Sequence, residues 1–502
     1  MITHVRILIP KCSPNVAFVT KRTKFKMKPD QKKTPSITNS DRALEHFDLY
    51  YKPVFGKLWP SIRISLLTAK KSSVVINNFS QYEEHIHYLL SLGAKDILTK
   101  ARNRQKNYTT TSKNQISVGN FSGKQEEPEN FENRLSDMRK FTEIAPFEKR
   151  LSDMRKVTEN APFEKRLSDM RKVTENNPNG NIVETENDFL QNNITLGETD
   201  RQNLDVFLPA KTIYSEHTQK RLTEARQSVY TPMDVRVDIV KPPAVALPSN
   251  LTVLAFPPGN TGMFPEPKPD VPGGYLCHFM MDGASILPVI ALGVQEGDSV
   301  LDLCAAPGGK SLVMLQTRLP GHLHCNDRSK GRIERLRSIF RQYVPEADQK
   351  TLRTSLRIGQ QFQEPIYDKV LVDGPCFTDR HALLEDTHNV FSPMRLNDRL
   401  EMPNLQRELL RAGIQSCKPG GAVVYSTCTL SPVQNDGIVQ ATIDDIWKNT
   451  GINLEIDDLS EMKYIFRDTF KFHDGCRFGQ LVVPSLSRNF GPMYFSRIRR
   501  VS

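Results

Sequence analysis

The chain has 502 residues, 38% of them hydrophobic and 25% charged, with a formal net charge of +11. A chain of this length exceeds one ordinary domain, so we expect two or three. No run approaches about 18 uncharged apolar residues, which excludes a transmembrane helix, and we expect no membrane partner. The eight cysteines include no CxxC pair and follow no secretory signal, so we expect reduced thiols and no metal site.

The N-terminus is basic and contains no acid before Asp30. Lys and Arg side chains within residues 1–29 contribute +7 of the net charge, and apolar residues lie between them. This pattern is typical of a mitochondrial transit peptide, here residues 1–35, and predicts a protein of the mitochondrial matrix. The alternative interpretation is a basic arm that contacts RNA.

Residues 40–120 carry apolar residues at helical intervals and predict a small N-terminal helical region. Residues 121–200 are polar and contain three tandem copies of a 16-residue unit, each with the sequence RLSDMRK and a final proline. One unit has too little apolar surface to fold alone, so we predict a disordered insertion, with a docking array as the alternative. The proline-rich residues 201–275 are expected to connect this insertion to the main domain.

Residues 276–502 alternate between β-branched runs and helical patterns. We expect strands at 298–304, 322–327, 367–373 and 422–427, and helices from about Lys310, over 330–344 and from Pro403. This alternation predicts an α/β domain, with a doubly wound, mostly parallel sheet covered by helices on both faces. Ligands of such sheets bind outside the carboxyl ends of the strands.

The loop after the first of these strands has the sequence CAAPGGKS. It is not a Walker A motif, because Cys304 stands where that motif requires its first glycine. Gly308 and Gly309 still allow a ligand to approach backbone N–H groups at a helix start, which favours a carboxylate. Asp327, at the end of the second strand, is placed to bind a ribose. A nucleoside with a carboxylate fits both features, and S-adenosylmethionine is such a cofactor.

Two cysteines also follow strand ends: Cys376 lies in DGPC and Cys428 in STCT. Either thiol alone would be interpreted as buried and structural. Two thiols on neighbouring strand ends beside a nucleoside site instead indicate chemistry. Their separate roles do not follow from the residues themselves.

The motifs LDLCAAPGGK, LVDGPC and YSTCT, in this order and spacing, resemble the RNA cytosine-C5 methyltransferases of the Fmu/Sun family. The segments MDGASILPVIALGV and NFGPMYF extend the resemblance, which covers roughly 40–120 and 205–502. These segments are most typical of the members that act on mitochondrial ribosomal RNA and lack a PUA domain. The resemblance implies a Rossmann-like, S-adenosylmethionine-dependent methyltransferase of mitochondrial small-subunit rRNA. It also implies a role in ribosome assembly, with an mTERF-type helical-repeat protein as partner.

The resemblance further implies catalytic roles. Cys428 would attack carbon 6 of cytosine, which makes carbon 5 nucleophilic toward the methyl donor. Cys376 would assist product release, and Asp373 would hydrogen-bond the N3 and exocyclic amine of the base.

The cofactor-binding residues follow from the same resemblance. Gly308, Gly309 and Lys310 would line the methionine part of S-adenosylmethionine. Asp327 would hold its ribose, and the remaining implied contacts are Arg332 and Asp373.

Two positions depart from the family pattern. Residues 354–361 contain no acid, although the family places Asp-Gly on the adenine side, and Phe377 follows Cys376 where threonine is usual. The first departure concerns cofactor affinity, and the second concerns the fit around the base.

Candidate RNA contacts are two groups of arginines: Arg332, Arg335, Arg337, Arg341, Arg497, Arg499 and Arg500. The main alternative to an enzyme is a catalytically silent, rRNA-binding assembly factor. The intact pair of cysteines favours the enzyme.

Overall fold

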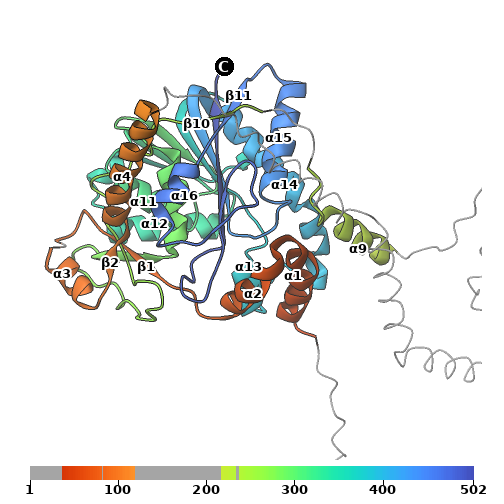
Figure 1. Cartoon of the computed structure of the whole chain (residues 1–502), viewed down its shortest axis with the longest axis horizontal. Coiled ribbons are helices and arrows are strands. Elements are labelled where there is room, and N and C mark those ends of the chain that lie inside the picture. The colour runs from red at the N-terminus through yellow and green to blue at the C-terminus, as the bar shows by residue number, and fades with distance from the viewer. Residues whose placement is uncertain (1–36, 82, 119–215, 233–236) are drawn as a thin grey trace, which may run out of the picture. The chain divides into compact units, whose positions relative to one another are not determined.

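The computed structural model of the protein describes residues 37–81, 83–118, 216–232 and 237–502. The predicted transit peptide and the predicted disordered insertion, with its repeats, lie outside these residues. The chain divides into two compact units. The first unit consists of Met1–Arg102 and Lys220–Ser502, and the second unit consists of Asn103–Gln219. The helices α4 (Ile97–Val118) and α9 (Glu216–Gln227) each cross a boundary between the units. All other elements below belong to the first unit (Figure 1).

A ten-stranded sheet forms the centre of the first unit. In spatial order its main path consists of β12 (Phe472–His473), β13 (Gln480–Val482), β14 (Met493–Arg500), β10 (Cys417–Thr427), β9 (Tyr367–Asp373), β6 (Ser299–Asp302), β7 (His322–Asn326) and β8 (Leu352–Ser355). Off this path, β11 (Leu454–Asp457) pairs with β14 and with β3 (Ile239–Val240). The strands from β10 to β8 are parallel. The predicted α/β fold with a mostly parallel sheet is confirmed.

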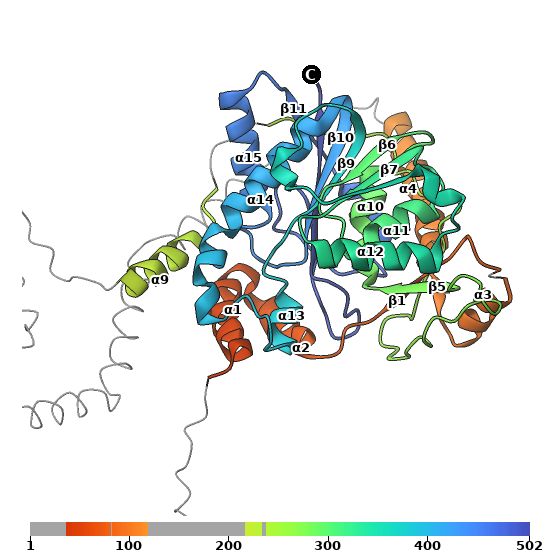
Figure 2. The ribbon, with the colours of Figure 1, turned by 180° about the vertical axis from the view of Figure 1, so that it is seen from behind.

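Both faces of this sheet are buried. Successive side chains of a strand point to opposite faces, so one strand contributes to the core on each side. In β9, Val370 and Val372 pack into one hydrophobic cluster and Leu371 into another. The first cluster includes α14 (Leu396–Ser416) and α15 (Asp436–Asn449). The second includes three helices that lie in front of the sheet in Figure 2: α10 (Leu287–Leu292), α11 (Gly309–Gln316) and α12 (Lys330–Tyr343). This double cover explains the apolar runs within the central strands, such as Val370 to Val372 in β9.

The helix predicted to begin at Pro403 begins seven residues earlier, at Leu396. Its first turns are held by tertiary contacts, since the Arg399 guanidinium donates to the carbonyls of Val390 and Ser392 and pairs with Glu224 at 2.5 Å. A proline inside a helix loses one backbone hydrogen bond. The helix nevertheless continues through Pro403, with these contacts of Arg399 in its first turns.

The region predicted to be helical, residues 40–120, also contains strands. It forms α1 (Asn39–Phe55), α2 (Trp59–Leu67), β1 (Ser73–Ile76), α3 (Glu83–Ser91) and β2 (Lys95–Asp96) before α4. The two strands join β4 (Val253–Ala255) and β5 (His278–Met281) in an antiparallel sheet of order β2-β4-β1-β5. The strand β1 has four residues, all buried, and its partners lie far along the chain. A helical periodicity search therefore misses it.

The remaining described helices are short. They are α13 (Asp379–Leu384), α16 (Ser460–Phe466) and the 3₁₀ turns η1 (Gly56–Leu58), η3 (Gly283–Ile286), η4 (Asp348–Thr351), η5 (Gly359–Gln361) and η6 (Pro393–Arg395). None of the helices in the described ranges combines the length and the apolar character that crossing a bilayer requires.

Helices α1, α2 and α13 lie side by side in both views of the fold (Figures 1 and 2). A capping box between Thr38 and Asp41 starts α1, which buries Phe47 and Tyr51. The Tyr51 hydroxyl lies 3.2 Å from the hydroxyl of Thr429, two residues after the end of β10. The N-terminal helices therefore reach the carboxyl edge of the central sheet.

Candidate active site

The loop between β6 and α11 supplies two glycines at the start of the helix. Gly308 has a φ of +117°, which favours glycine, and a Cβ there would lie 3.4 Å from the Leu336 side chain. A Cβ on Gly309 would lie 3.4 Å from the Phe279 ring. The glycines therefore let the loop pack closely and leave backbone N–H groups accessible to a ligand.

Asp327, just after β7, has a buried carboxyl group with an acceptor to spare. Its Oδ1 accepts a hydrogen bond from the Ser329 N–H at 2.9 Å. Its Oδ2 lies 3.1 Å from the Arg332 guanidinium but accepts no hydrogen bond of good geometry. Arg332 also donates to the Ala306 carbonyl. A buried acceptor that pairs with an arginine but accepts no well-aligned hydrogen bond could accept from a ribose hydroxyl, the partner expected from the sequence.

Asp302, at the end of β6, is a further candidate site residue that the sequence analysis did not name. Its Oδ2 accepts from the Ser311 hydroxyl at 2.6 Å, whereas its buried Oδ1 has no hydrogen-bond partner. Burial raises the pKa of this carboxyl to about 7, and the charge of Asp373 adds to the increase. Its place at a strand end, next to the glycine loop, was a signal that could have identified it.

The loop after β8 lies directly beside Asp327. The Asp327 N–H donates to the Ser355 carbonyl at 3.2 Å, and the Arg357 N–H donates to the side chain of Asn326 at 3.1 Å. Leu356 and Ile358 are 51% and 53% exposed. This edge therefore offers apolar and cationic side chains where the resemblance led us to expect an acid.

Lys310 and Asp373 form an ion pair at 2.7 Å between α11 and the end of β9. The other carboxyl oxygen of Asp373 accepts from the Ser426 hydroxyl at 2.7 Å. Burial lowers the pKa of Lys310, but the adjacent Asp373 charge and hydrogen bond outweigh it and raise the pKa overall. Lys310 therefore stays charged beside the cysteines.

The two candidate cysteines lie together, with their Sγ atoms 3.1 Å apart, and both are free thiols. The pKa of Cys428 is raised well above its usual value, first by its hydrogen bond to Cys376 and then by burial. The Asp373 charge also raises this pKa, and the Lys310 charge opposes the increase. The structure thus brings Lys310, Asp373 and both thiols into one site.

Buried glutamines and an aromatic cluster hold the Cys376 loop. Gln406 donates to the Pro375 carbonyl at 2.7 Å, and Gln434 accepts from the Phe377 N–H at 3.3 Å. The Phe377 ring packs edge-on against Phe391, with ring centroids 5.4 Å apart. The aromatic side chain that replaces threonine at this position therefore fills a core cluster.

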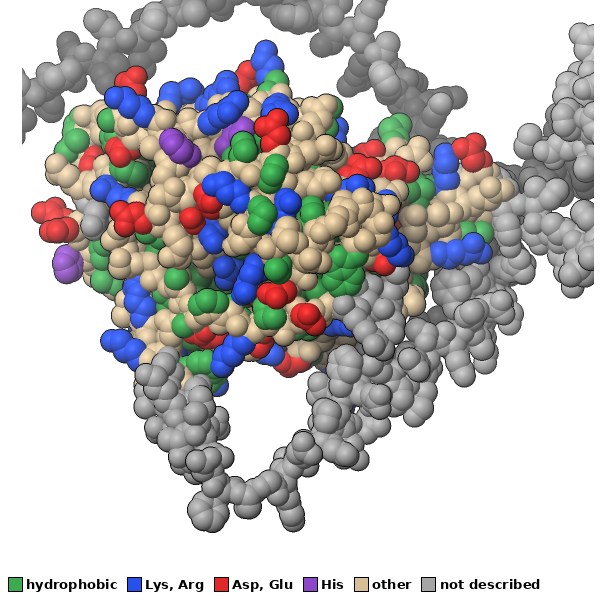
Figure 3. All heavy atoms as spheres, turned by 90° about the horizontal axis from the view of Figure 1, so that it is seen from above, with side chains coloured by type: hydrophobic (Ala, Val, Ile, Leu, Met, Phe, Trp, Pro, Cys, Tyr) green, Lys and Arg blue, Asp and Glu red, His purple; other side chains and the backbone are tan. Residues whose placement is uncertain are grey.

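The C-terminal arginines are not placed to contact RNA at this site. Arg497 and Arg499 both pair with the buried Asp457, and Arg500 donates to the carbonyl of Cys417 at 2.8 Å. Because β14 is antiparallel to β10, these residues lie toward the edge opposite the cysteines. Figure 3 shows Lys and Arg interspersed with Asp and Glu on the face seen from above.

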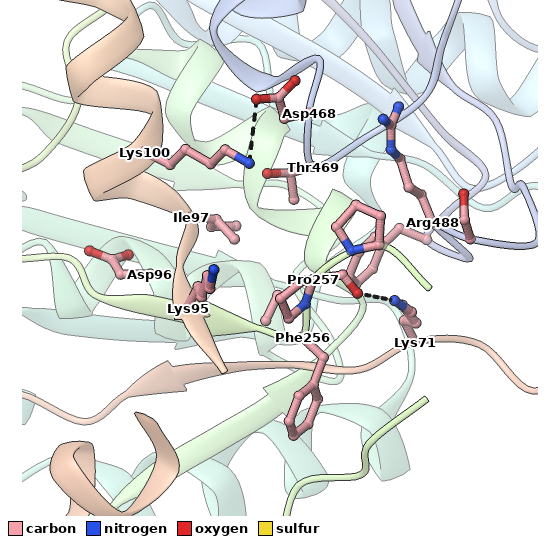
Figure 4. Close-up of a pocket in the computed structure, with 14 residues that line it drawn as sticks. Lys71, Lys95, Asp96, Ile97, Lys100, Phe256, Pro257, Asp468, Thr469 and Arg488 are labelled. Carbon is pink, nitrogen blue, oxygen red and sulfur yellow. Dashed lines mark hydrogen bonds and ion pairs between the residues drawn. The ribbon is translucent and has the colours of Figure 1, made fainter. Parts of the chain in front are cut away.

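A pocket outside this site is lined by several cations, among them Lys71, Lys100 and Arg488 (Figure 4). Lys71 donates to the Pro257 carbonyl at 2.7 Å, and Lys100 pairs with Asp468 at 3.3 Å. These partners account for the two lysines, so we assign the pocket no ligand. Within the ranges that the structure describes, His, Cys, Asp and Glu side chains form no group that could hold a metal.

Comparison with known proteins identifies the family. Residues 289–474 match the model of the 16S rRNA methyltransferase RsmB/F family. The 5-cytosine rRNA methyltransferase NSUN4 of Xenopus laevis is 35% identical over 93% of this chain and 92% of its own length. The corresponding nsun-4 protein of Caenorhabditis elegans is 33% identical over 96% of each chain.

A zebrafish mitochondrial tRNA (cytosine(34)-C(5))-methyltransferase is 42% identical over 45% of this chain and 61% of its own length. The NSun6 structure from Pyrococcus horikoshii, solved with SFG, has 23% identity and a TM-score of 0.35 over 45% of this chain and 54% of that one. The match to the NSUN4 proteins spans nearly the whole of both chains. The chain belongs to the family of 5-cytosine rRNA methyltransferases that includes NSUN4 and carries the RsmB/F methyltransferase domain.

Proposed function

We propose that this enzyme methylates carbon 5 of a cytosine in mitochondrial small-subunit rRNA, through a transient bond between Cys428 and carbon 6 of the base. The observation that carries the proposal is the position of Cys428, 3.1 Å from a second thiol at the carboxyl edge of the sheet. The names of the relatives support an rRNA cytosine as the substrate. The zebrafish and mouse tRNA enzymes named mitochondrial support that location, and we propose the matrix.

The residues around the glycine loop fit S-adenosylmethionine, the methyl donor. Gly308, Gly309 and Lys310 would hold its methionine part, and Asp327 with Arg332 would hold its ribose. When bound, the cofactor supplies an electrophilic methyl group on a sulfonium. The spare buried acceptor of Asp327 supports this assignment.

The protein's own groups then act on the base. Carbon 5 of cytosine is a poor nucleophile until Cys428, with its thiol proton released to solvent, adds to carbon 6 as a thiolate and forms an enamine-like ring. The Asp373 carboxyl would accept from the exocyclic amine and, in its protonated form, donate its proton to N3, which stabilises the negative charge that develops on the ring. After carbon 5 has gained the methyl group it loses its proton, and the bond between sulfur and carbon 6 breaks. Cys376 would be the base that accepts this proton, so that the Cys428 sulfur can leave; its Sγ lies 3.1 Å from that of Cys428, which supports the proposal.

Two substitutions test these roles. Cys428→Ala should abolish methylation, measured by bisulfite sequencing of mitochondrial rRNA from depleted cells that express the variant. Cys376→Ala should accumulate a covalent RNA–protein adduct on a denaturing gel. Cys417→Ala, a buried free thiol at the other end of β10, is the control and should behave as wild type. Methylation by Cys428→Ala, or an ordinary free product pool with Cys376→Ala, would refute the corresponding role.

We also propose a role in ribosome assembly, together with an mTERF-type helical-repeat partner. Exposed apolar side chains on α1 and α2 are available for such a contact: Leu49, Val54, Ile64 and Leu67. Cells that carry only Cys428→Ala distinguish this role from methylation. Assembled small subunits without the methyl group would support a separate assembly role, and loss of both would contradict it.

A further inference from the structure

A buried polar cluster lies directly beside Cys428, and the chemistry above does not use it. It consists of Tyr51, Asp379 and Thr429, which are all 1% exposed or less. Asp379 Oδ1 accepts from the Thr429 hydroxyl at 2.7 Å and from the Tyr51 hydroxyl at 3.3 Å. Asp379 Oδ2 accepts from the Leu430 N–H at 2.7 Å. One carboxyl group thus holds both residues that follow the nucleophile.

This carboxyl group connects three segments that are distant in sequence. Tyr51 belongs to α1, Asp379 begins α13 three residues after Cys376, and Thr429 follows Cys428. Asn435 holds the other side of the same loop. It accepts from the Thr427 hydroxyl at 2.6 Å and donates to the Thr429 carbonyl at 3.0 Å. The backbone on both sides of the nucleophile is therefore fixed.

Stability alone does not account for the cluster. Burial raises the pKa of Asp379 to about 7, which reflects the cost of removing this carboxyl from water. An apolar core of the same shape would avoid that cost. A carboxyl group can fix the orientation of the loop, which an apolar side chain cannot do, because its two oxygens each accept a hydrogen bond from one of two adjacent loop residues.

We propose that Asp379 and Tyr51 are positioning residues, which orient the Cys428 loop so that the thiol meets carbon 6 of the target base. The inference rests on the proposed role of Cys428 as the nucleophile. Through Tyr51, helix α1 contributes to the rate of the covalent step from outside the methyltransferase domain. A displacement of about 1 Å in a reacting group can reduce a rate by roughly a hundredfold.

The test replaces the Thr429 hydroxyl with a methyl group of the same size. We measure the rate at which full-length enzyme forms a covalent adduct with rRNA that contains 5-fluorocytosine, at saturating S-adenosylmethionine. Fluorine at carbon 5 cannot leave as a proton does, so the adduct persists. Thr429→Val should lower the adduct rate and kcat by about tenfold or more, with KM for RNA unchanged. Thr429→Ser, which restores the hydroxyl, should recover most of the wild-type rate.

A matched control separates positioning from stability. Thr442 is also fully buried, and its hydroxyl donates to the Ile438 carbonyl at 2.7 Å within α15. Thr442→Val removes an equivalent buried hydroxyl and should leave the adduct rate unchanged. A wild-type rate for Thr429→Val, or equal losses for both valine variants, would overturn the proposal.

Two further variants complete the test. Tyr51→Phe removes only the hydroxyl that α1 contributes and should slow adduct formation by roughly threefold. It also carries the test if Thr429→Val does not fold, and a wild-type rate would then overturn the proposal. An adduct formed by Cys428→Ala would refute the nucleophile itself, an outcome distinct from failure of the positioning role.

Discussion

The Sγ atoms of Cys376 and Cys428 lie 3.1 Å apart, although 52 positions separate the two residues in the chain. The contact depends on the parallel pairing of β9 and β10, which places Asp373 opposite Ser426 and both following loops at one edge. The hydrogen bond to Cys376 raises the pKa of Cys428, so the resting enzyme holds this thiol protonated. The nucleophile therefore needs its surroundings to change before it can react.

Removal of Cys376 should make Cys428 more reactive toward a small alkylating agent. Cys376→Ala removes the largest contribution to the raised pKa of Cys428, so more thiolate is present at pH 8. We expect carbamidomethylation of Cys428 by iodoacetamide to accelerate by at least about threefold, measured by mass spectrometry of the cofactor-free enzyme. Cys476, whose pKa is raised mainly by burial, is the internal control. An unchanged or slower rate at Cys428 would contradict the assigned direction.

Asp302 should make the protein less stable as the pH rises. Its pKa is about 3.8 as an unperturbed carboxyl and about 7 in the fold, because burial favours the protonated form. Between these values the folded state binds the extra proton, so the free energy of unfolding falls from pH 4 to 7 and levels off above 7. The effect is at most about 4 kcal/mol.

The variant that tests this expectation is Asp302→Asn, which cannot titrate. Its stability relative to wild type should increase between pH 5 and pH 8, measured by urea unfolding at both values. If the difference between Asp302→Asn and wild type does not depend on pH, the protonated Asp302 is ruled out.

The sequence predicted which residues lie at the candidate edge of the sheet, because the patterns that mark them are local. The strand ending at Asp373 has the predicted bounds, since an apolar run of seven residues in a parallel sheet needs no partner to be recognised. The cofactor loop and Asp327 follow such strands directly. Cys376 and Cys428 were predicted to lie on neighbouring strand-end loops, because the carboxyl ends of parallel strands share one edge, and the structure brings their Sγ atoms to 3.1 Å.

Other features depend on contacts between distant segments. The strand β1 is short and is held by pairing with β4 and β5. The cluster of Tyr51, Asp379 and Thr429 joins residues up to 378 positions apart, and no local pattern marks it. Arg497 is another example, because only the fold reveals its pairing with Asp457.

Arg380 should be a major contributor to stability where α2, α13 and the loop before β14 meet. Its buried guanidinium donates to the Ser65 carbonyl at 2.9 Å, to the Asn489 side chain at 2.8 Å and to the Gly491 carbonyl at 3.0 Å. Arg380→Met leaves these acceptors without donors and should lower the free energy of unfolding by about 3 kcal/mol or more. The control, Arg395→Met, removes the exposed pair with Asp398 and should cost less than about 1 kcal/mol. Equal losses in urea unfolding would contradict the assignment.

The affinity for the cofactor should depend little on the exocyclic amine of its adenine, if residues 354–361 line the adenine. Residues 354–361 contain no carboxylate that could accept from that amine, and the neighbouring Leu356 and Ile358 offer apolar contact. S-adenosylhomocysteine and its N6-methyl derivative should therefore bind with Kd values within about threefold of each other, measured by titration calorimetry. The 2′-deoxy derivative should bind about tenfold more weakly, because the buried Asp327 carboxyl would lose its expected partner.

Arg357→Asp tests whether the missing carboxylate explains the weak selectivity at N6, because it introduces one on this loop. A carboxylate on this loop, beside Asp327, would supply an acceptor for the amine, since the Arg357 backbone is fixed by Asn326. The variant should bind S-adenosylhomocysteine several-fold more tightly than wild type and should discriminate more strongly against the doubly N6-methylated derivative, which has no N–H to donate. Strong discrimination at N6 by the wild-type enzyme would mean that another group accepts from the amine, and the apolar and cationic edge after β8 would then not be the adenine-binding surface.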